Sequence, residues 1–198
     1  MSFGPTTTNT ALPWQLITSK TSSDKLLIER IAGGEQLAMS TLFSRHKTHL
    51  HRFLVRIVRD QNLAEDLVSD VFLDVWRQAE HFAARSSVST WLHAIGRLKA
   101  FSVLRRRRTH AEQNDEGTTA IADRGDNPET VLEKKNSAEV LRLCVDSLSP
   151  IHRQVIDLVY YHEKSVSEVM KIVGIPLATV KTRMFYARKQ LATLVMAA

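Results

Sequence analysis

The sequence predicts an all-α protein with two small helical domains joined by a flexible, acidic linker. Apolar residues recur with a helical period through most of the chain, and no useful stretch alternates like a β-strand. Residues 109–136 are acidic and poor in apolar residues, with Gly117, Gly125 and Pro128 as punctuation, which is typical of a linker. We therefore expect a mobile leader (1–23), a first domain (24–108), the linker (109–136) and a second domain (137–198).

Composition restricts the possible partners and the compartment. The chain has 198 residues, of which 43% are hydrophobic, enough to build a packed core. Its formal charge of +6 favours an anionic partner, either nucleic acid or an acidic protein surface. Cys144 is the single cysteine, so an internal disulfide is excluded. Because no signal peptide and no run of roughly 18 apolar residues is found, we expect a cytoplasmic protein that does not insert into membranes.

The first domain begins with three expected helices. Apolar residues define one from Asp24 to Gly33 and a longer one over residues 35–59. Asn62 and Glu65 have the spacing of a capping box, which predicts the start of a third helix extending to about Glu80.

That third helix carries an acidic ridge, formed by Asp66, Asp70 and Asp74. Like charges four residues apart cost an isolated helix a few tenths of a kcal/mol each, so the ridge does not serve helix stability. Phe72 and Trp76 belong to a second apolar row beside it. An acidic ridge beside exposed aromatics is suited to docking on a basic partner. The alternative is a solvated face whose aromatics complete the core.

A polar loop (81–89) and a helix from Thr90 to about Arg108 follow. The helix combines Trp91 and Phe101 with Arg97, Lys99 and a terminal run of four arginines. Aromatic rings beside cations can stack on unpaired bases while holding the nucleic-acid backbone. The arginine run is more typical of phosphate contact than of base reading, and its affinity would depend strongly on salt.

The second domain contains expected helices over 137–147 and 149–162, then a helix-turn-helix over 165–189. Ser165 and Glu168 form a capping-box pattern, Gly174 suits a left-handed helix end, and Pro176 suits the start of the next helix. A stripe of apolar residues in the second helix predicts its buried face. Its other faces carry cations and hydroxyls suited to phosphates and base edges. The alternative is a helical hairpin with a merely solvated face.

Motifs for catalysis or metal binding are not found in the sequence. His46, His49 and His51 share an expected helix, but no carboxylate or cysteine completes a recognisable metal set. No Walker loop, G-x-S-x-G or H-E-x-x-H pattern occurs. We therefore expect no enzyme activity, no cofactor and no metal.

Three motifs in order resemble the sigma-70 family, and specifically its extracytoplasmic-function (ECF) group. AEDLVSDVFLDVWRQAEHF resembles the segment that docks on the clamp helices of core RNA polymerase. SSVSTWLHAIGRLKAFSVLRRRR resembles the loop and helix that melt and read the promoter −10 element. The segment from Leu148 to Leu191 resembles the module that reads the −35 element. The resemblance covers residues 24–195 and implies a region 2-like domain followed by a region 4-like domain.

The resemblance implies three sets of binding residues. The polymerase-docking set comprises Asp66, Leu67, Val68, Asp70, Val71, Phe72, Asp74 and Trp76. The −10 set comprises Phe82, Arg85, Ser86, Ser87, Trp91, Arg97, Lys99, Arg105, Arg106, Arg107 and Arg108. The −35 set comprises Thr179, Lys181, Thr182, Arg183, Tyr186, Arg188 and Lys189.

The implied partners are core RNA polymerase (its beta-prime clamp and beta flap), promoter DNA and an anti-sigma factor that covers both modules. The implied function is signal-responsive promoter recognition. Three residues depart from the family pattern. Gly96 and Leu98 stand where the −10 helix often has alanine and asparagine, and Met170 stands where a small alanine is usual. The alternative function is a stand-alone helix-turn-helix regulator, which would bind duplex DNA tightly without polymerase.

Overall fold

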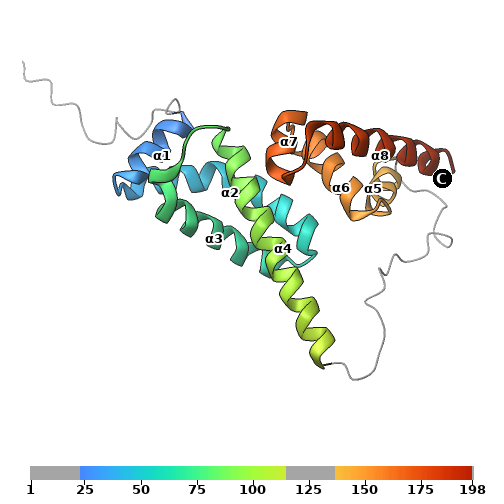
Figure 1. Ribbon diagram of the computed structural model, residues 1–198, viewed down its shortest axis with the longest axis horizontal. Coiled ribbons are helices and arrows are strands. Elements are labelled where there is room, and N and C mark those ends of the chain that lie inside the picture. Colours follow the sequence, from blue (N-terminus) through green and yellow to red (C-terminus); the bar gives the residue numbers. More distant parts are fainter. Residues whose placement is uncertain (1–22, 115–136, 198) are drawn as a thin grey trace, which may run out of the picture.

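The computed structural model describes residues 23–114 and 137–197, and these residues form two helical modules (Figure 1). Residues 1–22 of the expected leader and residues 115–136 of the expected linker lie outside the described residues. Within the two described ranges every regular element is a helix, as the sequence predicts. No described helix is both long enough and apolar enough to cross a membrane.

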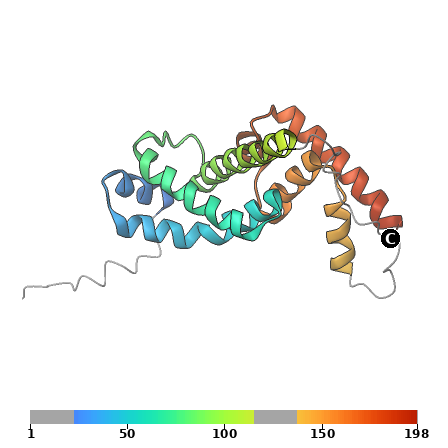
Figure 2. The same cartoon turned by 90° about the horizontal axis from the view of Figure 1, so that it is seen from below.

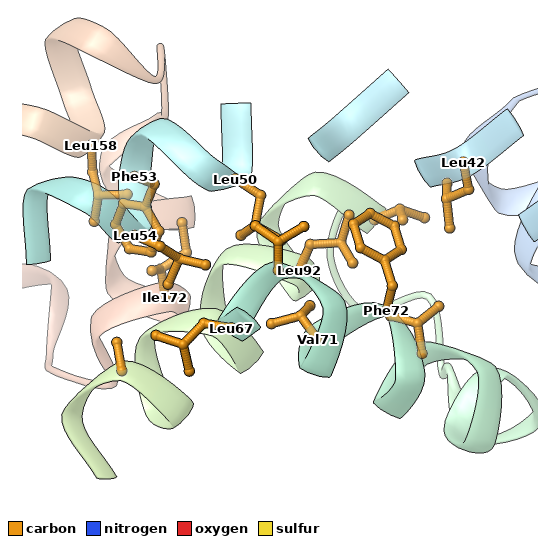
Figure 3. Close-up of a cluster of buried hydrophobic side chains, with 14 of the residues drawn as sticks. Leu42, Leu50, Phe53, Leu54, Leu67, Val71, Phe72, Leu92, Leu158 and Ile172 are labelled. Carbon is orange, nitrogen blue, oxygen red and sulfur yellow. The ribbon is translucent and has the colours of Figure 1, made fainter. Parts of the chain in front are cut away.

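The first module consists of α1 (Asp24–Ala32), α2 (Gln36–Val58), α3 (Gln61–Gln78), a 3-10 turn (Ala79–His81) and α4 (Val88–Asn114). α2, α3 and α4 pack around a core in which Leu50, Val71 and Leu92 are fully buried (Figure 3). Gly96 allows the close packing of α4 on α2, because a Cβ there would lie 3.1 Å from Leu50 Cδ1.

Two expected helix boundaries in this module differ from the structure. α3 begins at Gln61 because the Asp60 carboxylate accepts a hydrogen bond from Leu63 N at 3.1 Å, so Asp60 caps this helix and not Asn62. That hydrogen bond also lowers the pKa of Asp60. α4 continues past Arg108 to Asn114, so residues 109–114, which we expected in the linker, are helical.

The second module consists of α5 (Ser137–Asp146), α6 (Pro150–Ile156), a π-helical turn (Asp157–Tyr161), α7 (Val166–Val173) and α8 (Leu177–Ala197). The capping box of Ser165 and Glu168 is present at the start of α7, and Gly174 ends that helix with a φ of 72°. This positive φ is the left-handed conformation that glycine adopts without steric cost. The expected helix-turn-helix is therefore formed by α7 and α8.

The buried face of α8 is also as expected. Val180, Met184 and Ala187 are buried, and Leu191 is partly buried against the core of this module.

The two modules share one continuous apolar core. Leu158 of the π-helical turn and Ile172 of α7 lie beside Phe53 and Leu54 of α2 (Figure 3). α7 packs along α4, and Figure 2 shows the second module packed against one end of the first module. The relative placement of the modules therefore rests on side-chain packing, and residues 115–136 are not needed to explain it.

Candidate polymerase and nucleic-acid interfaces

The acidic ridge of α3 is only partly available for docking. Asp66 and Asp70 are exposed, whereas Asp74 is half-buried and its Oδ2 lies 2.8 Å from Lys99 Nζ. This ion pair connects the ridge to α4. Two free carboxylates, one turn apart, therefore remain on the outer side of the helix.

The apolar members of the docking set lie mainly in the core. Leu67, Val68, Val71 and Phe72 are each at most 5% exposed, which leaves their side chains unavailable to a partner. The expectation that Phe72 is an exposed aromatic is therefore wrong. Its ring packs edge-on against Phe43 with 4.9 Å between ring centroids, because the second apolar row faces α2. Trp76, at 37% exposed, is the member of this row that reaches the surface.

The loop before α4 and the start of α4 together present an aromatic pair. The rings of Phe82 and Trp91 lie 4.9 Å apart and both residues are partly exposed. Arg85 is exposed and Ser86 is half-buried. Ser87 is exposed, and its hydroxyl bonds to Thr90 and to a carboxylate of α7. The −10 residues of this loop are therefore brought together at the N-terminus of α4.

Along α4 the cations and apolar residues alternate on the surface. The Arg97 guanidinium lies over the Phe101 ring at 4.8 Å, and Phe101 is 44% exposed. Leu98, the residue at the usual asparagine position, is 66% exposed. Burial and the nearby positive charge of Arg183 lower the pKa of Arg97. Arg97 of the −10 set is thus within electrostatic range of Arg183 of the −35 set.

The arginine run lies beyond the core of the first module. Residues 105–108 are all exposed on α4 (Figure 1). Arg107 Nη1 is 3.5 Å from Asp60 Oδ2, a loose and exposed pair. Because the pair is exposed to solvent, it holds Arg107 only weakly in place.

The −35 set occupies the outer faces of α8. Its half-buried members are Thr179 and Arg183, and its exposed members are Lys181, Thr182, Tyr186, Arg188 and Lys189. Thr182 Oγ1 donates to Ala178 O at 3.0 Å, so its hydroxyl proton is used within the helix. Met170 is partly buried in the core beneath α7, where its flexible side chain fills the space.

Sequence reasoning missed the polar contacts between the modules. Glu168 Oε1 accepts hydrogen bonds from Thr90 Oγ1 at 2.7 Å and from Ser87 Oγ at 3.1 Å. Burial alone would raise the pKa of Glu168, but hydrogen bonds from Thr90, Ser165 and Ser87 lower it to about 2. The capping-box pattern marked Glu168 only as a local helix residue, and nothing in the sequence indicates its second role.

Three cationic side chains also make contacts between the two modules. Lys164 Nζ donates to Ser89 Oγ at 2.6 Å, and Lys171 Nζ donates to the Arg85 carbonyl at 2.5 Å. Arg56 Nη1 lies 2.7 Å from Asp157 Oδ1, and its guanidinium lies 3.8 Å from the Tyr161 ring.

A buried aromatic group lies between these contacts. The rings of His93 and His162 are 5.2 Å apart, and both pack against Phe53. His93 Nδ1 bonds to Ser89 O at 2.7 Å, and burial lowers the pKa of His93 to about 3. His93 is therefore neutral at physiological pH.

The histidines that the sequence suggested as metal ligands do not form a metal site. His46 Nε2 lies 2.7 Å from Asp24 Oδ2, and His49 is exposed. Within residues 23–114 and 137–197 no group of three or more candidate ligands is arranged to hold a metal ion.

The described residues thus form two helical modules, and the second carries a helix-turn-helix with exposed cations. Comparison with known proteins identifies the family. Sigma-70 region 2 matches residues 42–110, and sigma-70 region 4 matches residues 144–193. The ECF RNA polymerase sigma factor SigM of Mycobacterium tuberculosis (strain ATCC 25618 / H37Rv) is 30% identical over 172 residues, which cover 87% of this chain and 84% of SigM.

SigK of the same strain, also an ECF RNA polymerase sigma factor, is 29% identical over 177 residues, covering 83% of this chain and 89% of SigK. The chain belongs to the sigma-70 family and is an ECF sigma factor with regions 2 and 4. The family resemblance of the sequence is thereby confirmed. As a member of this family the protein is a non-enzymatic factor of transcription initiation.

Solved structures share the fold. CnrH, in complex with the cytosolic domain of CnrY, aligns with a TM-score of 0.64 at 23% identity and covers 89% of this chain and 99% of CnrH. The sigma factor RpoE, in complex with the anti-sigma factor NepR from Bartonella quintana, aligns with a TM-score of 0.56 at 24% identity. The alignment covers 75% of this chain and 91% of the RpoE chain.

Proposed function

We propose that this ECF sigma factor directs core RNA polymerase to promoters by holding the polymerase with α3 and the promoter at two separate elements. The observation that carries the proposal is the placement of three exposed chemical surfaces on one chain. α3 presents carboxylates beside Trp76, α4 presents aromatics beside cations, and α8 presents cations and hydroxyls.

The polymerase contact that we propose uses Asp66, Asp70 and Trp76. Two exposed carboxylates and an amphipathic ring suit a basic surface, here the beta-prime clamp. Asp74 is held by Lys99, and its part in the contact is to fix α3 against α4. The beta flap is the proposed partner of the second module.

The −10 contact that we propose uses the loop at residues 82–87 and the exposed side of α4. An unpaired base can stack on the Phe82 and Trp91 pair, while the arginines at 105–108 hold the phosphates. Unstacking a base costs a few kcal/mol, so the polymerase must help to stabilise the open strand.

The −35 contact that we propose uses α8 as a recognition helix in the major groove. Lys181 and Arg183 lie near its N-terminal end, where such helices meet base edges, and Arg188 and Lys189 lie further along the same helix. Because the chain carries both modules, weak binding at each element gives useful affinity for the pair.

We further propose that the protein acts in the cytoplasm and that an anti-sigma factor controls it. Support for the anti-sigma factor comes from RpoE, which has the same fold and was solved with NepR. The inducing signal would then act by releasing that partner.

The proposal is tested by mobility shift of promoter DNA with core polymerase alone, with the protein alone and with both. We expect a stable, salt-resistant complex only when both are present. A complex of equal affinity formed by the protein alone would contradict the proposal and favour a stand-alone regulator.

A further inference from the structure

α4 carries two large apolar side chains on its outer surface, Leu98 and Phe101, which we call the apolar pair of α4. Leu98 is 66% exposed, and Phe101, one turn further along the helix, is 44% exposed. Neither belongs to the −10 set, yet both lie between members of it. Lys99, which lies between them in the sequence, is held by its ion pair with Asp74. Single exposed leucines are common on protein surfaces, so the pair is informative only through its surroundings.

The neighbours of Leu98 on the helix surface are mostly apolar. Residues three or four positions apart lie side by side on an α-helix, and for Leu98 these are Ala94, Ile95, Phe101 and Ser102. Ile95 is partly buried and packs against the core. Ser102 is the one polar side chain among the four. This turn of α4 therefore offers few hydrogen-bonding groups to the edge of a base.

Cations lie at both ends of the apolar pair. The Arg97 guanidinium lies over the Phe101 ring at 4.8 Å, and its buried Nε has no hydrogen-bond partner among the residues that the structure describes. Arg105, one turn beyond Phe101, is exposed and begins the arginine run. A DNA strand whose phosphates meet Arg97 and Arg105 would therefore pass across the apolar pair.

The apolar pair also continues the surface that begins at the −10 loop. Trp91 and Leu98 are seven residues apart, which is about two helical turns, so they lie on the same side of α4 roughly 10 Å apart. The Trp91 ring lies 4.9 Å from that of Phe82, where we propose that an unpaired base stacks. Stacked nucleotides are about 3.4 Å apart along one strand. A strand held at Trp91 therefore reaches Leu98 within about three nucleotides.

An apolar surface can distinguish thymine from the other bases. The edges of adenine, guanine and cytosine carry hydrogen-bonding groups, and packing such an edge against leucine removes those groups from water without giving them a partner. Thymine presents a C5-methyl group, which packs favourably against apolar side chains. Burying one methyl group changes affinity by roughly three- to fourfold.

We propose that Leu98, supported by Phe101, contacts the C5-methyl group of a thymine in the non-template strand of the −10 element and makes the protein select thymine there. This inference rests on the proposed −10 function and deepens it, because it names the base that the exposed side of α4 reads. Arg97 and Arg105 hold the phosphates on either side. The contact needs no hydrogen bond from the side chain, which fits a helix that has leucine where the family often has asparagine.

The test replaces thymine by uracil, which removes only the C5-methyl group. The template is a promoter on which this protein and core polymerase give a run-off transcript. Its strands are mismatched across the −10 element, so that the replacement leaves base pairing unchanged. Each −10 thymine of the non-template strand is replaced in turn. At one position, wild type should form transcript roughly three- to fourfold more slowly at subsaturating polymerase.

Substitutions of Leu98 show whether this residue meets the methyl group. Leu98→Ala is too short and Leu98→Asn is polar, so both should transcribe the thymine and uracil templates equally. Leu98→Met should keep the preference, because methionine is apolar and has a similar volume. Leu37→Ala is the matched control, since Leu37 is 64% exposed on α2 and belongs to no proposed binding set. A purely structural role of Leu98 would lower transcription from both templates alike and leave their ratio unchanged.

Three results would overturn the role of Leu98. They are a −10 element without thymine in the non-template strand, a wild type that is indifferent to every replacement, and a full preference for thymine in Leu98→Ala. If the transcripts still need this protein in these cases, the proposed function stands and only the inference about Leu98 is wrong. If no template gives a transcript that needs this protein, the proposed function is wrong and the inference falls with it.

Discussion

Lys99 Nζ lies 2.8 Å from Asp74 Oδ2, so the proposed polymerase-docking helix and the proposed −10 helix are joined by an ion pair. The side chains are 26% and 24% exposed, which places the pair at the edge of the core. Asp74 and Lys99 were expected to serve polymerase and DNA respectively. Their pairing indicates that they fix the angle between α3 and α4.

This pairing predicts different roles within the acidic ridge. Asp66→Ala with Asp70→Ala should weaken core-polymerase binding by about 1–2 kcal/mol, roughly tenfold, because both carboxylates are exposed. Asp74→Ala should weaken it less and should instead lower the free energy of unfolding. Fluorescence titration with core polymerase and urea unfolding measure the two effects. Equal losses of affinity from all three positions would contradict this division.

The cations of α8 should control duplex binding. Lys181→Ala should lower affinity for −35 duplex DNA and reduce the slope of log affinity against log salt by about one. Arg183→Ala should cost about 1–3 kcal/mol if it meets a base edge. Gln190→Ala, an exposed change on the same helix, is the control. An unchanged salt slope in Lys181→Ala would show that this lysine meets no phosphate.

Gly96 should tolerate one added methyl group but not a branched side chain. In Gly96→Ala the gain of about 1 kcal/mol in helix propensity opposes the crowding of a Cβ 3.1 Å from Leu50 Cδ1, so stability should change little. Gly96→Val should cost about 1–3 kcal/mol by overpacking. Leu98→Val controls for branching at an exposed position of α4. Urea unfolding that leaves Gly96→Val as stable as wild type would contradict this packing.

Burial of neutral His93 should make stability depend on pH. Its pKa falls from 6.5 to about 3 on folding, so the unfolded chain takes up a proton below pH 6.5 and the folded protein does not. The contribution of His93 to stability is therefore lost as pH falls, by about 1 kcal/mol between pH 7.5 and 5.5. Lys164, His162 and His46 disfavour its protonation in the same direction.

Unfolding of wild type and His93→Gln across this pH range measures the effect. The variant should lose less stability on acidification than wild type. Parallel curves would mean that His93 is protonated equally in both states. Because Asp157 lies beside His162 and pairs with Arg56, the ionic strength must be held constant across the series.

Much of the fold could be predicted from local sequence, but the contact between the modules could not. Periodicity placed the helices, and the Ser165–Glu168 and Gly174 patterns placed the helix-turn-helix, because these signals act within a few residues. Phe72 was misassigned because helical spacing cannot say which of two apolar rows faces a neighbour. The bond from Thr90 to Glu168 spans 78 residues and follows from tertiary packing alone.

Run-off transcription with core polymerase, on templates whose −10 or −35 element is intact or scrambled, tests the central claim most directly. We expect a discrete transcript that needs this protein, core polymerase and both intact elements. Scrambling either element should abolish it, whereas scrambling the sequence between them at constant length should not. A transcript that is independent of this protein, or none from any template together with no binding to core polymerase, would contradict the account.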